Sequence, residues 1–326
     1  MRPSAPWFCT LLTAGAVWCG QATQDTPPAP VTTTQPTTTR PSAIGSTPTP
    51  FQPGVAIDWQ RREVHITTHV VLQAGQLEFF ACFGGKEHES ILRFDASATH
   101  IYIAMGLIGL LPGHPPEWDP SSRRYAPPTG DLIDIAVEWQ VDQRTMRADA
   151  YDWLYEVEYG RPPLPRPWVF AGSRARRDGT LSADHSGVGI ALVDFPDSLV
   201  CYSRRFPSRY GELWAAVNAT AVPPVGTEVK LVLRPAVARP MSVRLDHRGA
   251  AWVNGRVCTA ADLVDLLQHA RRLNPGYVQP IDASRALRSD QATLRRMLLD
   301  GGITDDAFRF RRPAPTSSTG SPPPPR

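Results

Sequence analysis

Hydrophobic residues recur with two periods along residues 52–236. Where they alternate with polar residues, successive side chains face opposite sides of a strand; where they return every three or four positions, they line one side of a helix. The pattern predicts strands at 58–71 (a hairpin turning at Gln60-Arg61-Arg62), 77–83, 131–140, 167–170, 187–193 and 229–233. It predicts one helix at 98–110, which ends before Gly113. Many strands with one helix indicate an α+β domain over 52–236.

Residues 241–311 show shorter repeats of the same kind. Thr259 and Asp262 have capping-box spacing before the amphipathic stretch 263–270, which predicts a helix. A second helix is predicted from the apolar face of Leu294, Met297 and Leu298, and it ends at Gly301-Gly302. Strands are expected at 242–245, 250–253, 277–281 and 307–310. The fold class is therefore α+β, a strand-rich N-terminal α+β domain followed by a small β-β-α-β-α-β sandwich module.

The N-terminus has the composition of an export signal. Arg2 is followed by no further charge until Asp25, and the mostly apolar run 7–18 precedes the small residues of Gly20-Gln21-Ala22. This pattern predicts a signal peptide over 1–22 that is cleaved after Ala22. The alternative is a retained membrane anchor, which would need about 20 mostly apolar residues.

Two further segments lack the large apolar side chains that a packed core requires. Residues 23–51 are mainly Thr, Pro, Ser and Gln, and residues 312–326 are rich in Pro. We predict a disordered Thr/Pro-rich tether and a disordered Pro-rich tail, because neither segment can bury enough surface to offset the entropy of ordering it. The expected protein is exported, and is periplasmic or lies in the cell envelope or outside the cell.

Charge and cysteine content narrow the class of protein. The formal net charge is +3, and no basic run alternates with aromatic residues, so we expect no nucleic-acid partner. Cys82, Cys201 and Cys258 follow the predicted signal, and three cysteines permit at most one internal disulfide. No later segment is long and apolar enough to predict a transmembrane span in the mature chain.

The densest group of chemically active side chains follows the predicted strand 77–83. It is the run Gly84-Gly85-Lys86-Glu87-His88-Glu89-Ser90. Lys86 is one of only two lysines among 34 basic residues, which favours a specific role for its compact ammonium group. We interpret Lys86, Glu87, His88, Glu89 and Ser90 as a candidate ligand-binding site, to which folding would add His100 and Asp184.

Three interpretations of this cluster remain open. His88, Glu89 and Glu87 could bind zinc or another divalent ion, although Leu92 stands where a zincin motif needs its second histidine. Lys86 and Ser90 could form a base and a nucleophile, although the sequence has no G-x-S-x-G motif. The cluster could instead be architectural, a turn closed by an ion pair between Lys86 and Glu89. The metal and any cofactor are unknown.

The first domain resembles the YdjY-domain family of exported proteins, whose function is largely uncharacterised. The resemblance covers about 52–205 and is carried by Val64, Leu77-Glu78, residues 85–92, His100, residues 110–113 and 128–131, Trp153, residues 168–173 and Asp184. It implies no particular reaction or cofactor.

Residues 241–310 resemble the soluble domain of the ExbD/TolR biopolymer-transport family. The carrying residues are Val243, Leu245, Gly249, residues 253–255, Leu263, Leu267, Asp282, Leu294, residues 301–303 and the closing strand. That family also has a transmembrane helix with a proton-coupling aspartate, whereas no carboxylate lies between Arg2 and Asp25 here. The resemblance therefore implies a shared fold rather than a motor function.

These observations favour a non-catalytic binding protein or envelope-associated protein whose ligand or envelope protein partner is unknown. The alternative is a hydrolase or metal-dependent enzyme centred on Lys86 to Ser90. The sequence leaves open whether the protein is an enzyme.

Overall fold

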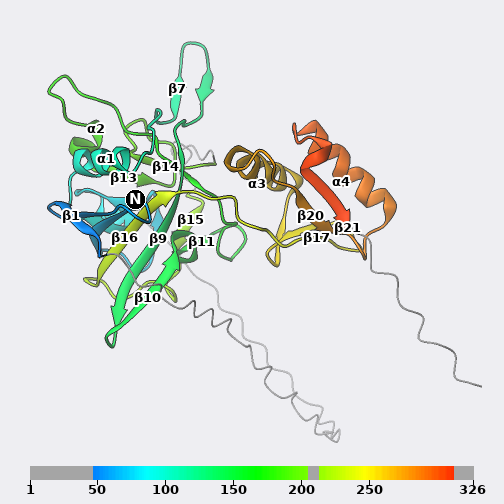
Figure 1. Ribbon diagram of the computed structural model, residues 1–326, viewed down its shortest axis with the longest axis horizontal. Coiled ribbons are helices and arrows are strands. Elements are labelled where there is room, and N and C mark those ends of the chain that lie inside the picture. Colours follow the sequence, from blue (N-terminus) through cyan, green and yellow to red (C-terminus); the bar gives the residue numbers. More distant parts are fainter. Residues whose placement is uncertain (1–46, 205–212, 312–326) are drawn as a thin grey trace, which may run out of the picture. The chain divides into compact units, whose positions relative to one another are not determined.

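The computed structural model describes residues 47–204 and 213–311 (Figure 1). The predicted signal peptide 1–22, most of the predicted tether 23–51 and the predicted tail 312–326 lie outside the described residues. Within the described ranges, no helix is both long enough and apolar enough to cross a membrane.

The first domain is built around a closed sheet of eight strands. In spatial order these are β3 (Glu63–Val70), β16 (Glu228–Pro235), β9 (Leu132–Val141), β12 (Trp168–Val169), β14 (Val200–Tyr202), β13 (Val188–Ala191), β5 (Phe79–Cys82) and β6 (Ser90–Phe94). Pairing of β6 with β3 closes the ring. The strands β1 (Thr49–Gln52), β2 (Val55–Asp58) and β10 (Arg144–Asp149) extend the same sheet to 11 strands.

The core of this domain lies on the inner face of the closed sheet. In β3, Val64 and Ile66 are fully buried whereas His65 and Thr67 between them are only partly buried, as expected for alternating side chains. Trp153 and Trp168 are also buried, and each lies beside Phe80, with ring centroids 6.4 and 5.9 Å away. This face supplies most of the domain's hydrophobic stabilisation.

Shorter elements complete the domain. They are β4 (Gln76–Leu77), η1 (Glu87–Glu89), α1 (Ala98–Leu107), β7 (Glu117–Asp119), β8 (Arg124–Ala126), η2 (Ala150–Trp153), β11 (Leu154–Glu156), α2 (Ser182–Ser186) and β15 (Ala215–Val217). Helix α1 and the hairpin at 60–62 confirm the sequence-based predictions. Periodicity missed β6, β7, β8, β10, β11, β14 and β15, most of which are too short to show a repeat. Strand β1 also extends the folded region into the end of the predicted tether.

The C-terminal module has one more strand than predicted. Its elements are β17 (Val243–Leu245), β18 (Ala251–Val253), β19 (Arg256–Cys258), α3 (Ala260–Leu273), β20 (Gln279–Asp282), α4 (Arg288–Asp300), η4 (Asp305–Ala307) and β21 (Phe308–Arg311). The sheet order is β19-β18-β17-β20-β21. Asn254 and Gly255 both have positive φ, so the chain reverses directly into β19 and the order is β-β-β-α-β-α-β.

The two helices of the module begin and pack largely as predicted. Thr259 and Asp262 form both hydrogen bonds of the capping box at the start of α3. In α4, Leu294 and Leu298 are buried. Met297, predicted to share their face, is 48% exposed, because that face is narrower than the apolar pattern suggests.

Cys82, Cys201 and Cys258 are free thiols, so the single disulfide that three cysteines allowed is not formed among them. Burial raises the pKa of Cys82 to about 11 and that of Cys201 to about 12. These thiols are therefore protonated and unreactive at neutral pH.

A second face of α3 contacts the first domain. Arg166, whose side chain is only 3% exposed, donates to Asp262 Oδ1 at 2.7 Å and forms an ion pair with Asp265. Arg256 donates to the carbonyl of Pro163, and Leu164 packs into the core of the C-terminal module. We call this contact region the junction.

Replacing Arg166 tests the importance of this ion pair. We expect Arg166→Ala to lower the free energy of unfolding by about 3 kcal/mol, because it removes the arginine of Asp265 and one of the two arginines that hold Asp262. Urea unfolding followed by tryptophan fluorescence measures the loss.

The control is Arg174→Ala, which removes a surface ion pair with Glu117 between side chains that are 48% and 63% exposed. It should cost about 0.5 kcal/mol or less. Equal effects of the two substitutions would show that Arg166 does not hold the junction.

Candidate functional site

The cluster at Lys86 to Ser90 forms the short helix η1 and the start of β6, and its charged groups contact one another. Lys86 Nζ lies 3.2 Å from Glu89 Oε1 and 5.9 Å from the centre of the Phe79 ring. His88 Nε2 lies 3.6 Å from Glu89 Oε2, and its side chain is 75% exposed. Glu87 is partly buried in the same turn. The geometry agrees with the architectural interpretation, in which Glu89 closes the turn.

Ser90 faces inward rather than toward solvent. It is fully buried, and its hydroxyl donates to the carbonyl of Leu92 at 2.8 Å. A nucleophile must reach its substrate. This position therefore gives no support to a hydrolytic pairing of Lys86 with Ser90.

Of the two residues predicted to join the cluster, His100 lies in the first turn of α1, and Asp184 lies in α2 and contacts that turn. Asp184 accepts hydrogen bonds from Ala98 N at 2.6 Å and from the Thr99 hydroxyl at 2.6 Å. The backbone N–H of His100 donates to Ser97. Asp184 thus caps α1 from α2. Nowhere in residues 47–204 and 213–311 do three or more His, Cys, Asp and Glu side chains form a group that could hold a metal ion.

A larger pocket lies at the junction. Its volume is about 170 Å³. Its apolar walls come from Pro165, Pro167, Val237, Ala238, Pro240, Met241, Leu266, Ala270 and Leu273, and its polar groups from Asp134, Tyr151, Arg166, Arg239, Asn254 and His269. We call it the junction pocket. The first domain, the linker and α3 all contribute to it.

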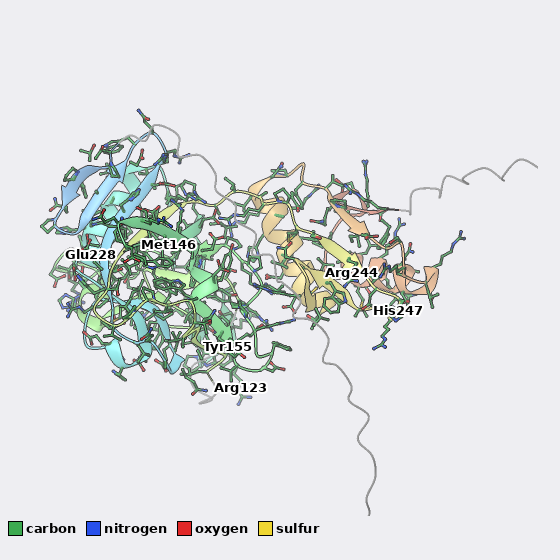
Figure 2. The ribbon with its side chains drawn as sticks, turned by 90° about the horizontal axis from the view of Figure 1, so that it is seen from below. Arg123, Met146, Tyr155, Glu228, Arg244 and His247 are labelled. Atoms are coloured by element: carbon green, nitrogen blue, oxygen red, sulfur yellow. The ribbon has the colours of Figure 1, made fainter. Side chains whose placement is uncertain are left out.

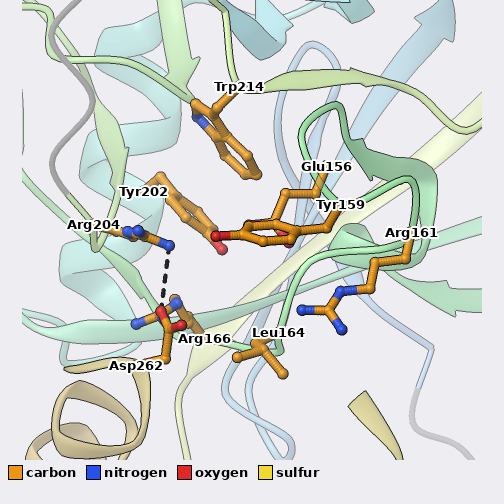
Figure 3. Close-up of a pocket in the computed structure, with 9 residues that line it drawn as sticks. All are labelled: Glu156, Tyr159, Arg161, Leu164, Arg166, Tyr202, Arg204, Trp214 and Asp262. Atoms are coloured by element: carbon orange, nitrogen blue, oxygen red, sulfur yellow. Dashed lines mark hydrogen bonds and ion pairs between the residues drawn. The ribbon is translucent and has the colours of Figure 1, made fainter. Parts of the chain in front are cut away.

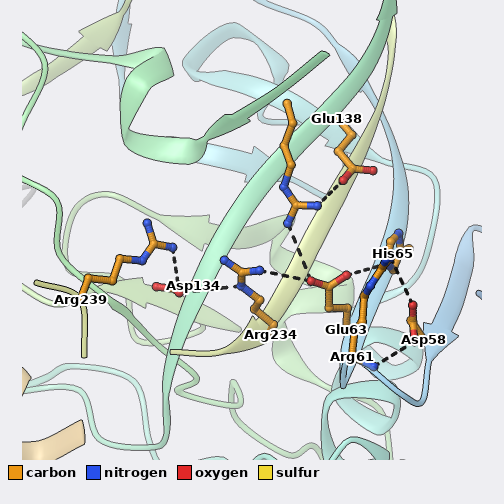
Figure 4. Close-up of polar contacts among 9 residues, drawn as sticks. Asp58, Arg61, Glu63, His65, Asp134, Glu138, Arg234 and Arg239 are labelled. Carbon is orange, nitrogen blue, oxygen red and sulfur yellow. Dashed lines mark hydrogen bonds and ion pairs between the residues drawn. The ribbon is translucent and has the colours of Figure 1, made fainter. Parts of the chain in front are cut away.

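A row of ion pairs on the outer face of the closed sheet leads to this pocket (Figure 4). Glu63 of β3 lies 3.3 Å from Arg234 of β16, which lies 3.8 Å from Asp134 of β9. Asp134 in turn pairs with Arg239 at 2.9 Å. The hydrogen bond from His65 and the charges of Arg147 and Arg234 lower the pKa of Glu63, although burial opposes them. Glu63 is therefore ionised at neutral pH.

The last cation of the row fixes the linker between the domain and the module. Arg239 donates to Asp149 Oδ2 at 2.9 Å and to the Tyr151 hydroxyl at 3.1 Å. Its carbonyl accepts a hydrogen bond from the hydroxyl of Tyr277 in the module. The linker wall of the pocket is thereby held from both sides.

His269 contributes a partly buried imidazole to the same pocket. Its Nδ1 lies 3.6 Å from Asp265 Oδ1, and its side chain is 15% exposed. Burial, and then the positive charges of Arg166 and Arg272, lower the pKa of His269 to about 4. The ring is therefore neutral at physiological pH.

Sequence reasoning missed every polar group of the junction pocket. One signal was available. Asp262, Asp265, His269 and Arg272 recur at helical spacing, so they form a polar stripe beside the apolar face of α3. Their partner Arg166 stands in the proline-rich run 162–167, which carries no periodicity.

Comparison with known proteins identifies the first domain. Residues 55–234 match the family model of the YdjY domain. The chain belongs to the YdjY domain family. The match extends past the predicted limit of residue 205 to β16, the strand that lies between β3 and β9 in the closed sheet. The YdjY domain therefore corresponds to the complete closed sheet.

The two other comparisons found no related protein. No significant match was found among curated proteins or among solved structures. The predicted resemblance of 241–310 to ExbD/TolR finds no support in these comparisons.

Mutation of the Lys86 to Ser90 cluster distinguishes architecture from binding. Glu89→Ala should lower the free energy of unfolding by about 1–3 kcal/mol, because it leaves the partly buried Lys86 without its partner. His88→Ala, at an exposed position, should change it by about 0.5 kcal/mol or less. Thermal unfolding with and without Zn²⁺ measures both effects. A stable Glu89→Ala variant that has lost Zn²⁺ binding would restore the metal interpretation.

His269 should make the protein sensitive to acid. The unfolded chain binds a proton on this ring near pH 6.5, whereas the folded chain binds it only near pH 4. The unfolded state therefore takes up the extra proton, and stability falls as the pH drops from 6.5 to 4. The loss attributable to His269 is about 3 kcal/mol.

Urea unfolding between pH 7 and pH 4 measures this contribution as the difference between the parent and His269→Gln, which should lose less stability in acid. His247, exposed in the turn 246–249 (Figure 2), is the matched control. His247→Gln should follow the parent. Parallel curves for the parent and both variants would contradict the assignment.

Proposed function

We propose that the protein is an exported, non-catalytic binding protein of the cell envelope or extracellular space, and that it holds a small, mainly apolar ligand in the junction pocket. The observation that carries the proposal is the position and lining of that pocket. Small-molecule sites typically measure about 300–1,000 Å³, favour domain interfaces and combine apolar walls with a few fixed polar groups. The junction pocket, with a volume of about 170 Å³, is smaller than this range but has the other two properties.

The polar groups of the pocket are already oriented without a ligand. Arg239 is held by Asp134, Asp149 and Tyr151. Asn254 uses its side-chain oxygen to accept from Ser242 N, which leaves its amide N–H groups to donate elsewhere. A ligand therefore meets fixed donors beside apolar walls, and little side-chain ordering opposes its binding. We infer an apolar ligand that carries a hydrogen-bond acceptor.

The C-terminal module would supply the envelope-associated part of this function. Its α+β fold, with two helices and a five-stranded sheet, supports retaining the ExbD/TolR resemblance as a proposal about fold. A partner protein in the envelope would contact this module.

The alternative enzyme centred on Lys86 to Ser90 has less support. Lys86 and Glu89 pair with each other, and the Ser90 hydroxyl is directed to a backbone carbonyl. No observation among the described residues places a substrate there, so we favour binding at the junction.

A fluorescent probe tests the pocket. The dye 1-anilinonaphthalene-8-sulfonate has an apolar body and an acceptor group, so it should bind saturably and fluoresce. Val237 lines the pocket and is 61% exposed, and Val237→Trp should fill it. We expect dye binding to weaken at least about tenfold, which is about 1.4 kcal/mol.

The matched control is Val225→Trp, because Val225 is equally exposed, at 61%, and does not line the pocket. This variant should bind the dye like the parent. Absence of saturable binding by the parent, or equal binding by all three proteins, would contradict the proposal.

A further inference from the structure

Two pockets at the junction have Arg166 in their walls, and they differ in the room they offer. The smaller one lies between Arg161, Arg204 and Trp214 (Figure 3), and its volume of about 10 Å³ admits about one water molecule. The junction pocket, at about 170 Å³, is the larger of the two. An apolar cavity of about 150 Å³ can bind benzene. The junction pocket therefore fits a single six-membered ring with one small substituent.

His269 lies within the apolar stripe of α3 that forms one wall of the junction pocket. Leu266, Ala270 and Leu273 occur at positions −3, +1 and +4 relative to it, so these side chains share one side of the helix. All of them line the pocket. Leu266 and Ala270 are buried, whereas His269 is partly buried. A polar ring therefore interrupts a wall that is otherwise apolar.

One ring nitrogen of His269 faces a carboxylate. Nδ1 is buried and lies 3.6 Å from Oδ1 of Asp265. This position favours the proton on Nδ1, because an unprotonated nitrogen would present its lone pair to the carboxylate oxygen. Burial lowers the pKa of His269 to about 4, so the ring has only this one proton at neutral pH. Nε2 is therefore a hydrogen-bond acceptor.

The acceptor at Nε2 is left open to the pocket. Unlike Nδ1, this nitrogen is not fully buried, and no group in residues 47–204 and 213–311 donates a hydrogen bond to it. The two arginines whose charges act on His269 have other partners. Arg166 pairs with Asp262 and Asp265, and Arg272 donates to the carbonyl of Gly130. A ligand in the pocket can therefore supply the donor.

The chemistry of the pocket selects among the groups that could donate to Nε2. A carboxylate has no proton to donate at neutral pH. An ammonium group would need a carboxylate, because a buried charge without a partner is costly. Asp134, the carboxylate of the pocket, is already paired with Arg234 and Arg239. A hydroxyl group donates without a charge, and its oxygen also meets the requirement for an acceptor.

Given the function proposed for the junction pocket, on which this step depends, we propose that its ligand is a small neutral alcohol of the size of phenol, whose hydroxyl group donates to Nε2 of His269. The ring of the ligand packs against the apolar stripe of α3. His269 then determines specificity, because it favours a hydroxyl group over a methyl group of similar shape. A site that pairs with a hydroxyl group rejects the analogue that lacks it, since the polar group of the protein is left without a partner.

Calorimetric titration at pH 7 with phenol and, separately, with toluene tests this assignment. The two molecules have nearly the same shape, but the methyl group of toluene cannot donate a hydrogen bond. Phenol should bind the parent and displace the dye 1-anilinonaphthalene-8-sulfonate. His269→Leu should lower the ratio of phenol affinity to toluene affinity at least about tenfold, which is about 1.4 kcal/mol. The ratio separates loss of the hydrogen bond from any change in apolar volume.

Two further variants complete the test. His269→Gln keeps a side-chain oxygen that can accept, so it should recover part of the ratio. His247→Leu, at an exposed histidine in the turn 246–249, is the matched control and should keep the ratio of the parent. Circular dichroism and urea unfolding confirm that each variant is folded.

The same phenol-to-toluene ratio in the parent and in a folded His269→Leu overturns the proposal. Failure of phenol to bind a parent protein that binds the dye also overturns it. In both cases the function proposed for the junction pocket stands, because the dye still binds there. A parent protein that binds neither phenol nor the dye contradicts the proposed function itself.

Discussion

The contact between the YdjY domain and the C-terminal module depends on a buried arginine held between two aspartates. Arg166 lies in a proline-rich segment that presents its side chain to α3, where Asp262 and Asp265 receive it. A buried guanidinium is tolerated only when opposite charges and hydrogen bonds replace the water it has lost. This requirement ties the orientation of α3 to the path of the chain between β11 and β12. Both pockets of the junction have Arg166 in their walls.

The two pockets differ because the residues around Arg166 differ on its two sides. On one side, the linker and the apolar residues of α3 make a wide pocket whose charged groups are already paired with one another. On the other side, Arg161, Arg204 and aromatic rings enclose a space of only about 10 Å³. The first arrangement suits an apolar ligand, whereas the second leaves room for about one water molecule. Arg166 separates the two pockets.

The cluster at Lys86 to Ser90 shows why dense chemistry in a sequence need not form a site. Adjacent residues in a tight turn point in several directions, so their functional groups are most easily satisfied by one another. Glu89 is within 3.6 Å of both Lys86 and His88, and Ser90 bonds the backbone two residues ahead. Asp184 is used to cap α1, because the first N–H groups of a helix lack partners within it.

The sequence by itself determined the elements whose formation depends on residues that are close together in the chain. Alternation in β3 and β9, helical spacing in α1, and the capping box of Thr259 and Asp262 are local properties, and each appears in the fold. The motif order also indicated the YdjY family. Strands of three residues, such as β19, were not predicted, because a repeat is recognisable only over several periods.

Only the tertiary structure decided where ligands could bind. Arg166 and Asp262 are 96 residues apart, as are Arg161 and Val257, and no local pattern encodes such a contact. The junction pockets arise where the closed sheet, the linker and α3 meet. No pattern in the sequence marks the side chains that these three segments contribute. The free energy of these contacts comes from excluding water around charges, which occurs only once the distant segments have come together.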